Sequence, residues 1–223
     1  MKRLSGITAL LAFMALMDAS SVRAEGRQGS AVPTVTPIFS QLLAVSLPQG
    51  FKIVFENTNG ANYIREATLA EESKNSWTQM ITITGAQNLA SNPNMSPKKF
   101  VEAMGGGFQR ACPDSFSGAE LSQGKISGND AYVAALSCGT SPMTAGQTSE
   151  SVVVAVIKGE RDYYTVQWAE RGKPSKTPVK LDMNMLAERF KQLAPIHLCP
   201  IVPGESPPYP SCIGANTREA AQP

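Results

Sequence analysis

Apolar residues recur at every second position in several short segments of the chain. Phe51, Ile53 and Phe55 show this spacing, with Lys52 between the first two. A period of two residues is typical of a β-strand that turns one face to a core. The segment 152–157 is apolar at every position, which indicates a strand buried on both faces. Strands are therefore predicted over 51–55, 63–69, 77–84, 120–126, 131–138, 152–157 and 163–169.

Two other segments have apolar residues at helical spacing. In the first, Ser96 is a good N-cap, and Pro97 suits the first helical position, where its missing N–H costs nothing. The second helix is predicted to begin near Asp182 and to end at Pro195. Three consecutive glycines, 105–107, interrupt the first helical pattern, and each costs about 1 kcal/mol relative to alanine in a helix. They predict either a break in the helix or a close approach of its backbone to the sheet.

The order of these segments, βββ-α-ββββ-α, predicts the fold class. Runs of strands with few helices between them form antiparallel sheets that pack their helices on a face. We therefore expect one α+β sandwich over 47–195, an antiparallel β-sheet with two packed helices.

The first 24 residues have the composition of a secretory signal peptide. Lys2 and Arg3 precede an apolar run over 7–17, and small residues lead to a cleavage site after Ala24. This run is about half the ~20 residues that a membrane-spanning helix needs, so export is predicted over retention as a membrane anchor. The segment 25–46 is small and polar with prolines, and is interpreted as a flexible lead-in with a short helix near 39–44.

All four cysteines follow the predicted cleavage site, so they enter an oxidising compartment, in which an even number indicates disulfides. Three pairings are possible. We favour Cys112–Cys138 and Cys199–Cys212, because each pair closes a modest loop within its own region. The second bond would then hold the proline-rich tail, 196–223. A zinc site built from Cys199 and His197 is the alternative, but the chain has neither a Cys-x-x-Cys motif nor a second histidine.

The balance of charges in the chain argues against two classes of partner. After removal of 1–24, basic and acidic residues are equal in number, and no run of like charges occurs. This balance argues against a nucleic-acid partner, which needs a clustered basic surface, and against electrostatic attachment to membranes. No sequence motif predicts a metal or a cofactor, and no membrane span is expected after removal of the signal peptide.

The chain resembles the Mog1/PsbP-like family, which includes the bacterial DcrB-like envelope proteins, over about 47–194. The resemblance rests on four motifs in order: 47–52 (LPQGFK), 96–100 (SPKKF), 127–131 (SGNDA) and 163–166 (YYTV) before the closing helix. Four cysteines and a long tail after Pro195 depart from the family pattern. The resemblance implies a Mog1/PsbP-like sandwich that acts as a non-catalytic assembly or accessory factor, with no catalytic residues to transfer.

Catalytic motifs are present only in fragments. Ser96 and Lys99 form a Ser-x-x-Lys, the spacing of nucleophile and base in penicillin-recognising enzymes, and 127–129 is similar to a second motif of those enzymes. The third, Lys-Thr-Gly or Lys-Ser-Gly, is missing, so an N-cap and an ordinary turn are the simpler interpretation. A serine triad would need His197, which follows a helix-stopping proline, and the glycines 105–107 lack the Lys-Ser/Thr of a phosphate loop.

The sequence therefore predicts a periplasmic or secreted bacterial protein without catalytic activity. It would act as an envelope accessory or protein-interaction scaffold whose partner is another envelope protein; no oligomeric state is predicted. Candidate binding surfaces are Tyr163 with Gln167 on a sheet face, and Tyr209 in the tail. The simpler interpretation of the tail is that it lies across a sheet edge and protects it from unwanted strand pairing. A small-ligand or lipid-binding module is the alternative, and a serine hydrolase through Ser96 and Lys99 is a remote one.

Intact mass spectrometry tests the predicted processing. Protein purified from the periplasm of its host is expected to begin after Ala24 and to gain two hydrogens per disulfide on reduction, for two disulfides. An unprocessed chain, or a mass unchanged by reduction, would contradict export and the cysteine pairing respectively.

Overall fold

The computed structural model describes residues 31–214, and these form an α+β domain of two antiparallel sheets and three α-helices. The predicted signal peptide, 1–24, lies outside the described residues. The α-helices are α1 (Pro97–Ala111), α2 (Met183–Leu193) and α3 (Pro210–Gly214), and short 3₁₀ turns are Leu89–Ser91 and Pro142–Thr144.

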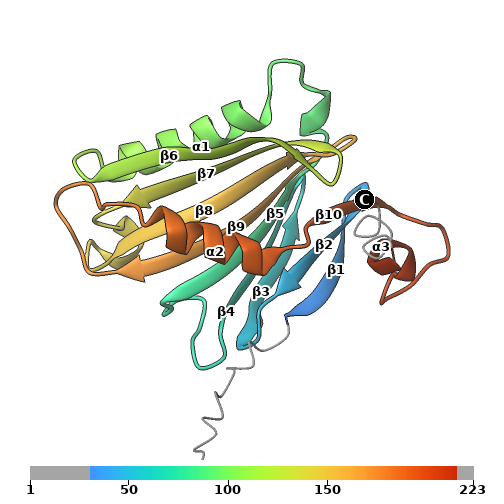
Figure 1. The fold of residues 1–223 in the computed structure, drawn as a ribbon, viewed down its shortest axis with the longest axis horizontal. Coiled ribbons are helices and arrows are strands. Elements are labelled where there is room, and N and C mark those ends of the chain that lie inside the picture. Colours follow the sequence, from blue (N-terminus) through green and yellow to red (C-terminus); the bar gives the residue numbers. More distant parts are fainter. Residues whose placement is uncertain (1–30, 215–223) are drawn as a thin grey trace, which may run out of the picture.

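The larger sheet has seven strands in the order β3-β4-β5-β9-β8-β7-β6 (Figure 1). Helix α1 connects β5 to β6, and α2 follows β9, so the predicted order βββ-α-ββββ-α is confirmed. The strands are β3 (Phe51–Asn59), β4 (Asn62–Leu69), β5 (Gln79–Ala86), β6 (Phe116–Ile126), β7 (Asn129–Cys138), β8 (Ser149–Lys158) and β9 (Tyr163–Gly172).

The smaller sheet joins the two ends of the described chain. It has the order β1-β2-β10, with β1 (Val32–Ile38), β2 (Gln41–Leu47) and β10 (His197–Pro200). The flexible lead-in predicted over 25–46 is therefore wrong for its described part, and the short helix near 39–44 is a turn and a strand. The prolines of this segment, Pro33 and Pro37, lie in β1, an edge strand, where a missing N–H is tolerated.

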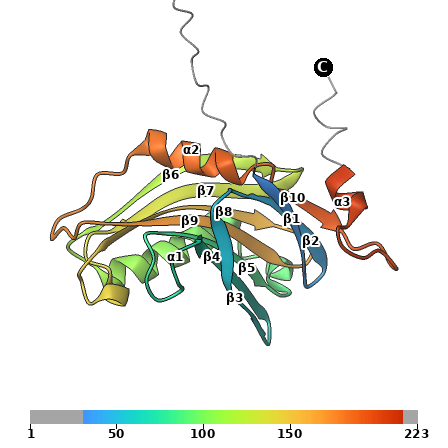
Figure 2. The same ribbon diagram turned by 90° about the horizontal axis from the view of Figure 1, so that it is seen from below.

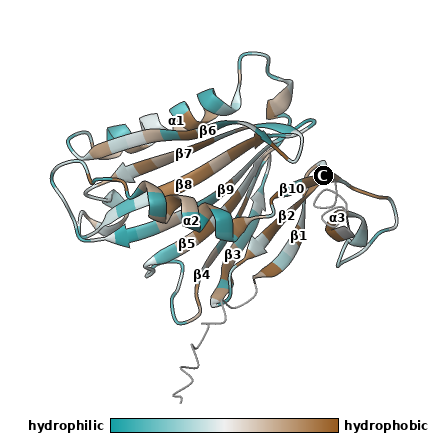
Figure 3. Ribbon diagram, viewed as in Figure 1, coloured by the Kyte–Doolittle hydropathy of each residue, from teal (hydrophilic) through white to brown (hydrophobic). Residues whose placement is uncertain are grey.

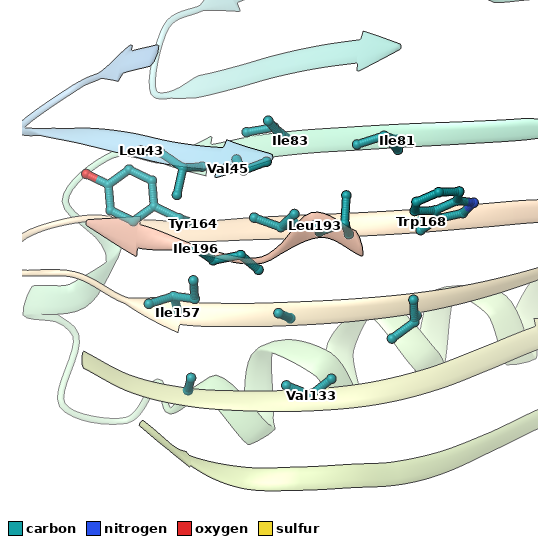
Figure 4. Packing of buried hydrophobic residues seen from close by; sticks show 14 of the residues in the cluster. Leu43, Val45, Ile81, Ile83, Val133, Ile157, Tyr164, Trp168, Leu193 and Ile196 are labelled. Carbon is teal, nitrogen blue, oxygen red and sulfur yellow. The ribbon is translucent and has the colours of Figure 1, made fainter. Parts of the chain in front are cut away.

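Different layers cover the two faces of the seven-stranded sheet (Figure 2). Helix α1 packs on one face, against β7 and β8. Helix α2 and the small sheet cover the other, where Leu193 and Leu43 join one core with Trp168 (Figure 4). Strands β7 and β8 carry the hydrophobic runs that both layers need (Figure 3), and residues 153–157 of β8 are completely buried.

Two disulfides attach peripheral elements to the sheets. Cys112, the C-cap of α1, is bonded to Cys138 at the end of β7, with 5.8 Å between the Cα atoms. Cys199 of β10 is bonded to Cys212 of α3, with Cα atoms 5.6 Å apart. The described part of the tail is thus a strand of the small sheet followed by a disulfide-closed loop.

Asp162 connects the β1–β2 hairpin to the larger sheet. Its carboxylate is buried and accepts hydrogen bonds from the backbone N–H of Asn88 (2.7 Å) and of Ser40 (3.0 Å), from the Ser40 hydroxyl, and from the Tyr164 hydroxyl (3.2 Å). Burial alone would raise the pKa of Asp162, but the bonds from Ser40, Asn88 and Tyr164 outweigh it, so this pKa is lowered. The carboxylate is therefore held ionised.

Asp162→Asn is expected to lower the free energy of unfolding by about 1.5–3 kcal/mol at neutral pH, because it replaces charge-assisted hydrogen bonds by weaker ones. A lowered pKa stabilises the fold above the pKa of the unfolded chain, about 3.9, and this contribution is lost as the pH falls through the folded value. Urea unfolding followed by tryptophan fluorescence at pH 7 and pH 3 should show the difference between wild type and variant shrink with acid. A difference that does not change with pH would contradict this role.

Candidate functional site

The structure corrects one of the predicted surface residues. Tyr163 is 1% exposed beneath α1, where its ring stacks on Phe100 at 5.6 Å and its hydroxyl donates to the Met95 carbonyl at 2.9 Å. The prediction failed because β9 is the middle strand of the sheet, so a layer covers each of its faces at Tyr163. Gln167, on the same side of β9, is half-buried, and its amide donates to the Thr165 hydroxyl at 2.9 Å.

Tyr209 lies in the disulfide-closed loop, and its half-buried side chain packs against the cluster formed by Leu42, Ala44, Cys199 and Cys212. The loop is braced internally, because the Glu205 carboxylate accepts from the backbone N–H of Ser211 (2.8 Å) and from its hydroxyl (2.6 Å). Tyr209 therefore takes part in holding the tail against the small sheet.

Ser96 and Lys99 have structural roles. The Ser96 hydroxyl oxygen accepts from the Lys99 backbone N–H at 3.2 Å, which makes it the N-cap of α1. The Lys99 amine donates to the Asn94 carbonyl at 3.0 Å. Both groups are thus engaged in starting the helix, the simpler of the two interpretations of the motif.

A contact between Ser127 and His197 was missed at the level of sequence. The Ser127 hydroxyl, in the β6–β7 turn, is hydrogen-bonded to Nδ1 of His197 in β10 at 2.7 Å. Within residues 31–214 no carboxylate is hydrogen-bonded to this histidine, so the pair lacks the acid that would orient a catalytic imidazole. The Ser127–His197 hydrogen bond holds β10 against the larger sheet. Sequence analysis did not find it, because Ser127 lies in a turn and His197 in the tail, and no local pattern connects the two.

Within residues 31–214, no group of three or more His, Cys, Asp and Glu side chains is placed to hold a metal ion. The helices of this part of the chain are too short or too polar to cross a membrane.

A concave surface lies between α1 and the edge strand β6, and we call it the α1–β6 groove. It consists of two hollows that share Tyr132 of β7. The first, of about 580 Å³, is lined by Ser96, Pro97, Lys98, Gln123, Gly124, Lys125, Asp130, Ala131 and Tyr132. The second, of about 310 Å³, is lined by Val101, Glu102, Gly105, Gly106, Gln109, Phe116, Gly118, Ala119, Glu120, Tyr132, Ala134 and Leu136.

Glycines on both walls keep the second hollow open. Helix α1 is continuous through the three glycines, and the predicted close approach to the sheet occurs at Gly105, where a Cβ would lie 3.5 Å from Leu136. On β6, a Cβ at Gly118 would lie 3.3 Å from Leu136. Gly106 is different, because its nearest neighbour would be the flexible Arg110 guanidinium, at 3.4 Å. No packing requirement explains a helix-weakening glycine at that position.

Two carboxylates give the second hollow its charge. Glu120 of β6 accepts a hydrogen bond from the Tyr132 hydroxyl at 2.7 Å, and Glu102 of α1 lies on the opposite wall. Burial, the bond to Glu120 and the negative charges of Glu120 and Glu102 together raise the pKa of Tyr132 to about 12. The phenol therefore remains a neutral donor, and the hollow combines an apolar floor with an acidic rim.

Comparisons with known proteins give a distant likeness of fold. No protein-family model and no curated protein matches the chain. One similar solved structure is LpqN of Mycobacterium tuberculosis, involved in cell envelope biogenesis, with 9% identity, a TM-score of 0.39 and a match over 78% of this chain and 94% of LpqN. Another is the Ran-binding protein Mog1p of Saccharomyces cerevisiae, with 10% identity, a TM-score of 0.39 and a match over 74% of this chain and 86% of Mog1p. A Bacteroides thetaiotaomicron protein is similar over 81% of this chain (12%, 0.42), but the match spans only 52% of that protein. The weak resemblance to Mog1-type proteins is thus found among solved structures too, and at these identities it concerns the fold alone.

The glycines can be separated by stability measurements. Gly106→Ala is expected to raise the free energy of unfolding by about 0.5–1 kcal/mol, because alanine is the better helix former and has room there. Gly118→Ala, whose Cβ would be crowded by Leu136 and Phe116, is expected to give no gain. Urea unfolding measures both, and destabilisation by Gly106→Ala would mean that the groove wall tolerates no side chain.

Proposed function

We propose that this protein is an exported, non-catalytic interaction module of the bacterial envelope, and that it binds another envelope protein through the α1–β6 groove. The groove carries the proposal: its second hollow has an apolar floor, an acidic rim formed by Glu102 and Glu120, and a wall that Gly106 leaves without a side chain. A concave surface of this composition offers an occupant both apolar contact and charged partners.

Three further observations support parts of this proposal. The two disulfides and the predicted signal peptide suit an oxidising, extracytoplasmic compartment. The candidate nucleophiles have structural partners, since Ser96 caps α1 and Ser127 holds His197. The groove is open along the side of the molecule and is lined by both apolar and charged residues, as protein-binding surfaces are.

Site-specific photo-crosslinking in the host tests the location. A benzoylphenylalanine at Gln109, in the groove wall, is expected to give a discrete protein adduct, whereas one at Ala103, an exposed position of α1 outside the lining, is not. Gly106→Leu should fill the groove and abolish the adduct while α1 stays stable. The matched control is Gly107→Leu, next in the same helix with open space around it, and it should leave the adduct unchanged.

Equal adducts from Gln109 and Ala103, or an adduct that survives Gly106→Leu, would contradict the groove as the binding surface. An adduct of the chain with itself would replace the envelope partner by a second copy. No protein adduct, together with a small molecule retained in native mass spectrometry and displaced by Gly106→Leu, would favour the alternative of a small-ligand module.

A further inference from the structure

The edge of the large sheet beside the groove is open to another strand. Strand β6 is last in the sheet order, and β7 is the strand that pairs with it in the described part of the chain. Native proteins protect such edges with lysines, prolines and bulges. The second half of β6 has this protection, with a bulge between Glu120 and Ser122 and with Lys125 beyond it.

The first half of β6, residues 116–120, has no bulge, and Glu120 is its one charged residue. It pairs regularly with β7, from Phe116 opposite Cys138 to Glu120 opposite Ala134, and it contains no lysine or proline. On the α2 side, the Ser117 hydroxyl donates to the Val179 carbonyl at 3.1 Å, so the chain approaches β6 there. The α1 side faces the groove, and Gly118 leaves it without a side chain at the middle of this stretch.

The charges of the groove select the kind of side chain that an added strand would carry. Glu102 and Glu120 are both exposed, both act on the Tyr132 phenol, and neither takes part in an ion pair of residues 31–214. At the other end of the groove, Lys125 is paired with Asp130 at 2.8 Å and Lys98 also lines the first hollow, so the acidic character belongs to the second hollow. A cationic side chain placed between these two carboxylates, Glu102 and Glu120, would be attracted by both of them.

We propose that the partner enters the α1–β6 groove as an extended segment that pairs with residues 116–120 of β6 and places a lysine or arginine between Glu102 and Glu120. Alternate residues of a strand point to the same face, so the residue opposite Gly118 and the residue opposite Glu120 enter the groove together. The residue opposite Gly118 fills the space left by that glycine with an apolar side chain. The residue opposite Glu120, separated from it by one residue of the added strand, is the cation. This inference rests on the proposed function, since it names the occupant of the same groove.

Fluorescence polarisation with defined peptides tests the charge. The probe is a short threonine-rich peptide with a central Leu-Thr-Lys, and its match has Glu in place of Lys. The Lys peptide is expected to bind, the Glu peptide to bind at least tenfold more weakly. Glu102→Gln with Glu120→Gln should weaken the Lys peptide about tenfold, the loss expected for two partly exposed ion pairs. The matched control changes two exposed carboxylates outside the groove lining, Glu71→Gln with Glu160→Gln, and should change nothing.

Amide hydrogen exchange tests the strand pairing, which side-chain contacts alone would not reproduce. With the Lys peptide bound, amides of residues 116–120 of β6 are expected to gain protection, while those of Phe51–Asn59, the opposite edge of the sheet, are not. Equal binding of the two peptides would overturn the charge selection, and binding without protection of β6 would overturn strand addition. If the peptide and exchange experiments fail but Gln109 still gives a protein crosslink, only the extended cationic segment is contradicted as the occupant. If the Gln109 crosslink is absent too, the proposed function is contradicted as well.

Discussion

The fold depends on a strand that has no solvent face. Residues 153–157 of β8 are completely buried, so each side of the large sheet must be covered by its own apolar layer. Helix α1 provides one, in which Val101 shares a buried cluster with Val152, Val154 and Val156; α2 and the small sheet provide the other. Hydrophobic burial at about 25 cal/mol per Å² makes this the dominant stabilising term, and the remaining elements lie where they complete these two layers.

Completion of the second layer requires polar as well as apolar contacts. The β1–β2 hairpin turns at Phe39 and Ser40, and the ionised Asp162 receives the backbone of that turn. The Gln41 side chain accepts from the Glu160 backbone N–H at 3.0 Å close by, and Arg65 of β4 donates to Thr36 of β1. These bonds fix the angle at which the small sheet crosses the large one, because a buried carboxylate is stable only where its donors are in place.

Local pattern was sufficient for the elements between 47 and 195, because their periodicity, caps and turns agree with the final packing. It failed for β1 and β2, where prolines and small residues suggested flexibility, although the two segments pair with each other as a hairpin and β10 adds to β2 from the other side. It also misplaced Tyr163, since alternation with Thr165 and Gln167 gives the face of a strand but not what covers that face. The glycines 105–107 indicated one wall of the groove, the helix α1. The other wall, β6, lies beside α1 only in the tertiary structure, so local sequence pattern could not predict it.

The small sheet joins the first and the last strand of the described chain, with β2 between β1 and β10. A chain that emerges amino terminus first, from a ribosome or through a membrane channel, therefore releases β2 long before its partner β10. Until residues 183–200 have emerged, one face of the large sheet lacks α2 and β10 and stays open to water and to other chains. Folding of this domain is thus completed late, and the order in which its segments appear determines how long an apolar surface must be shielded.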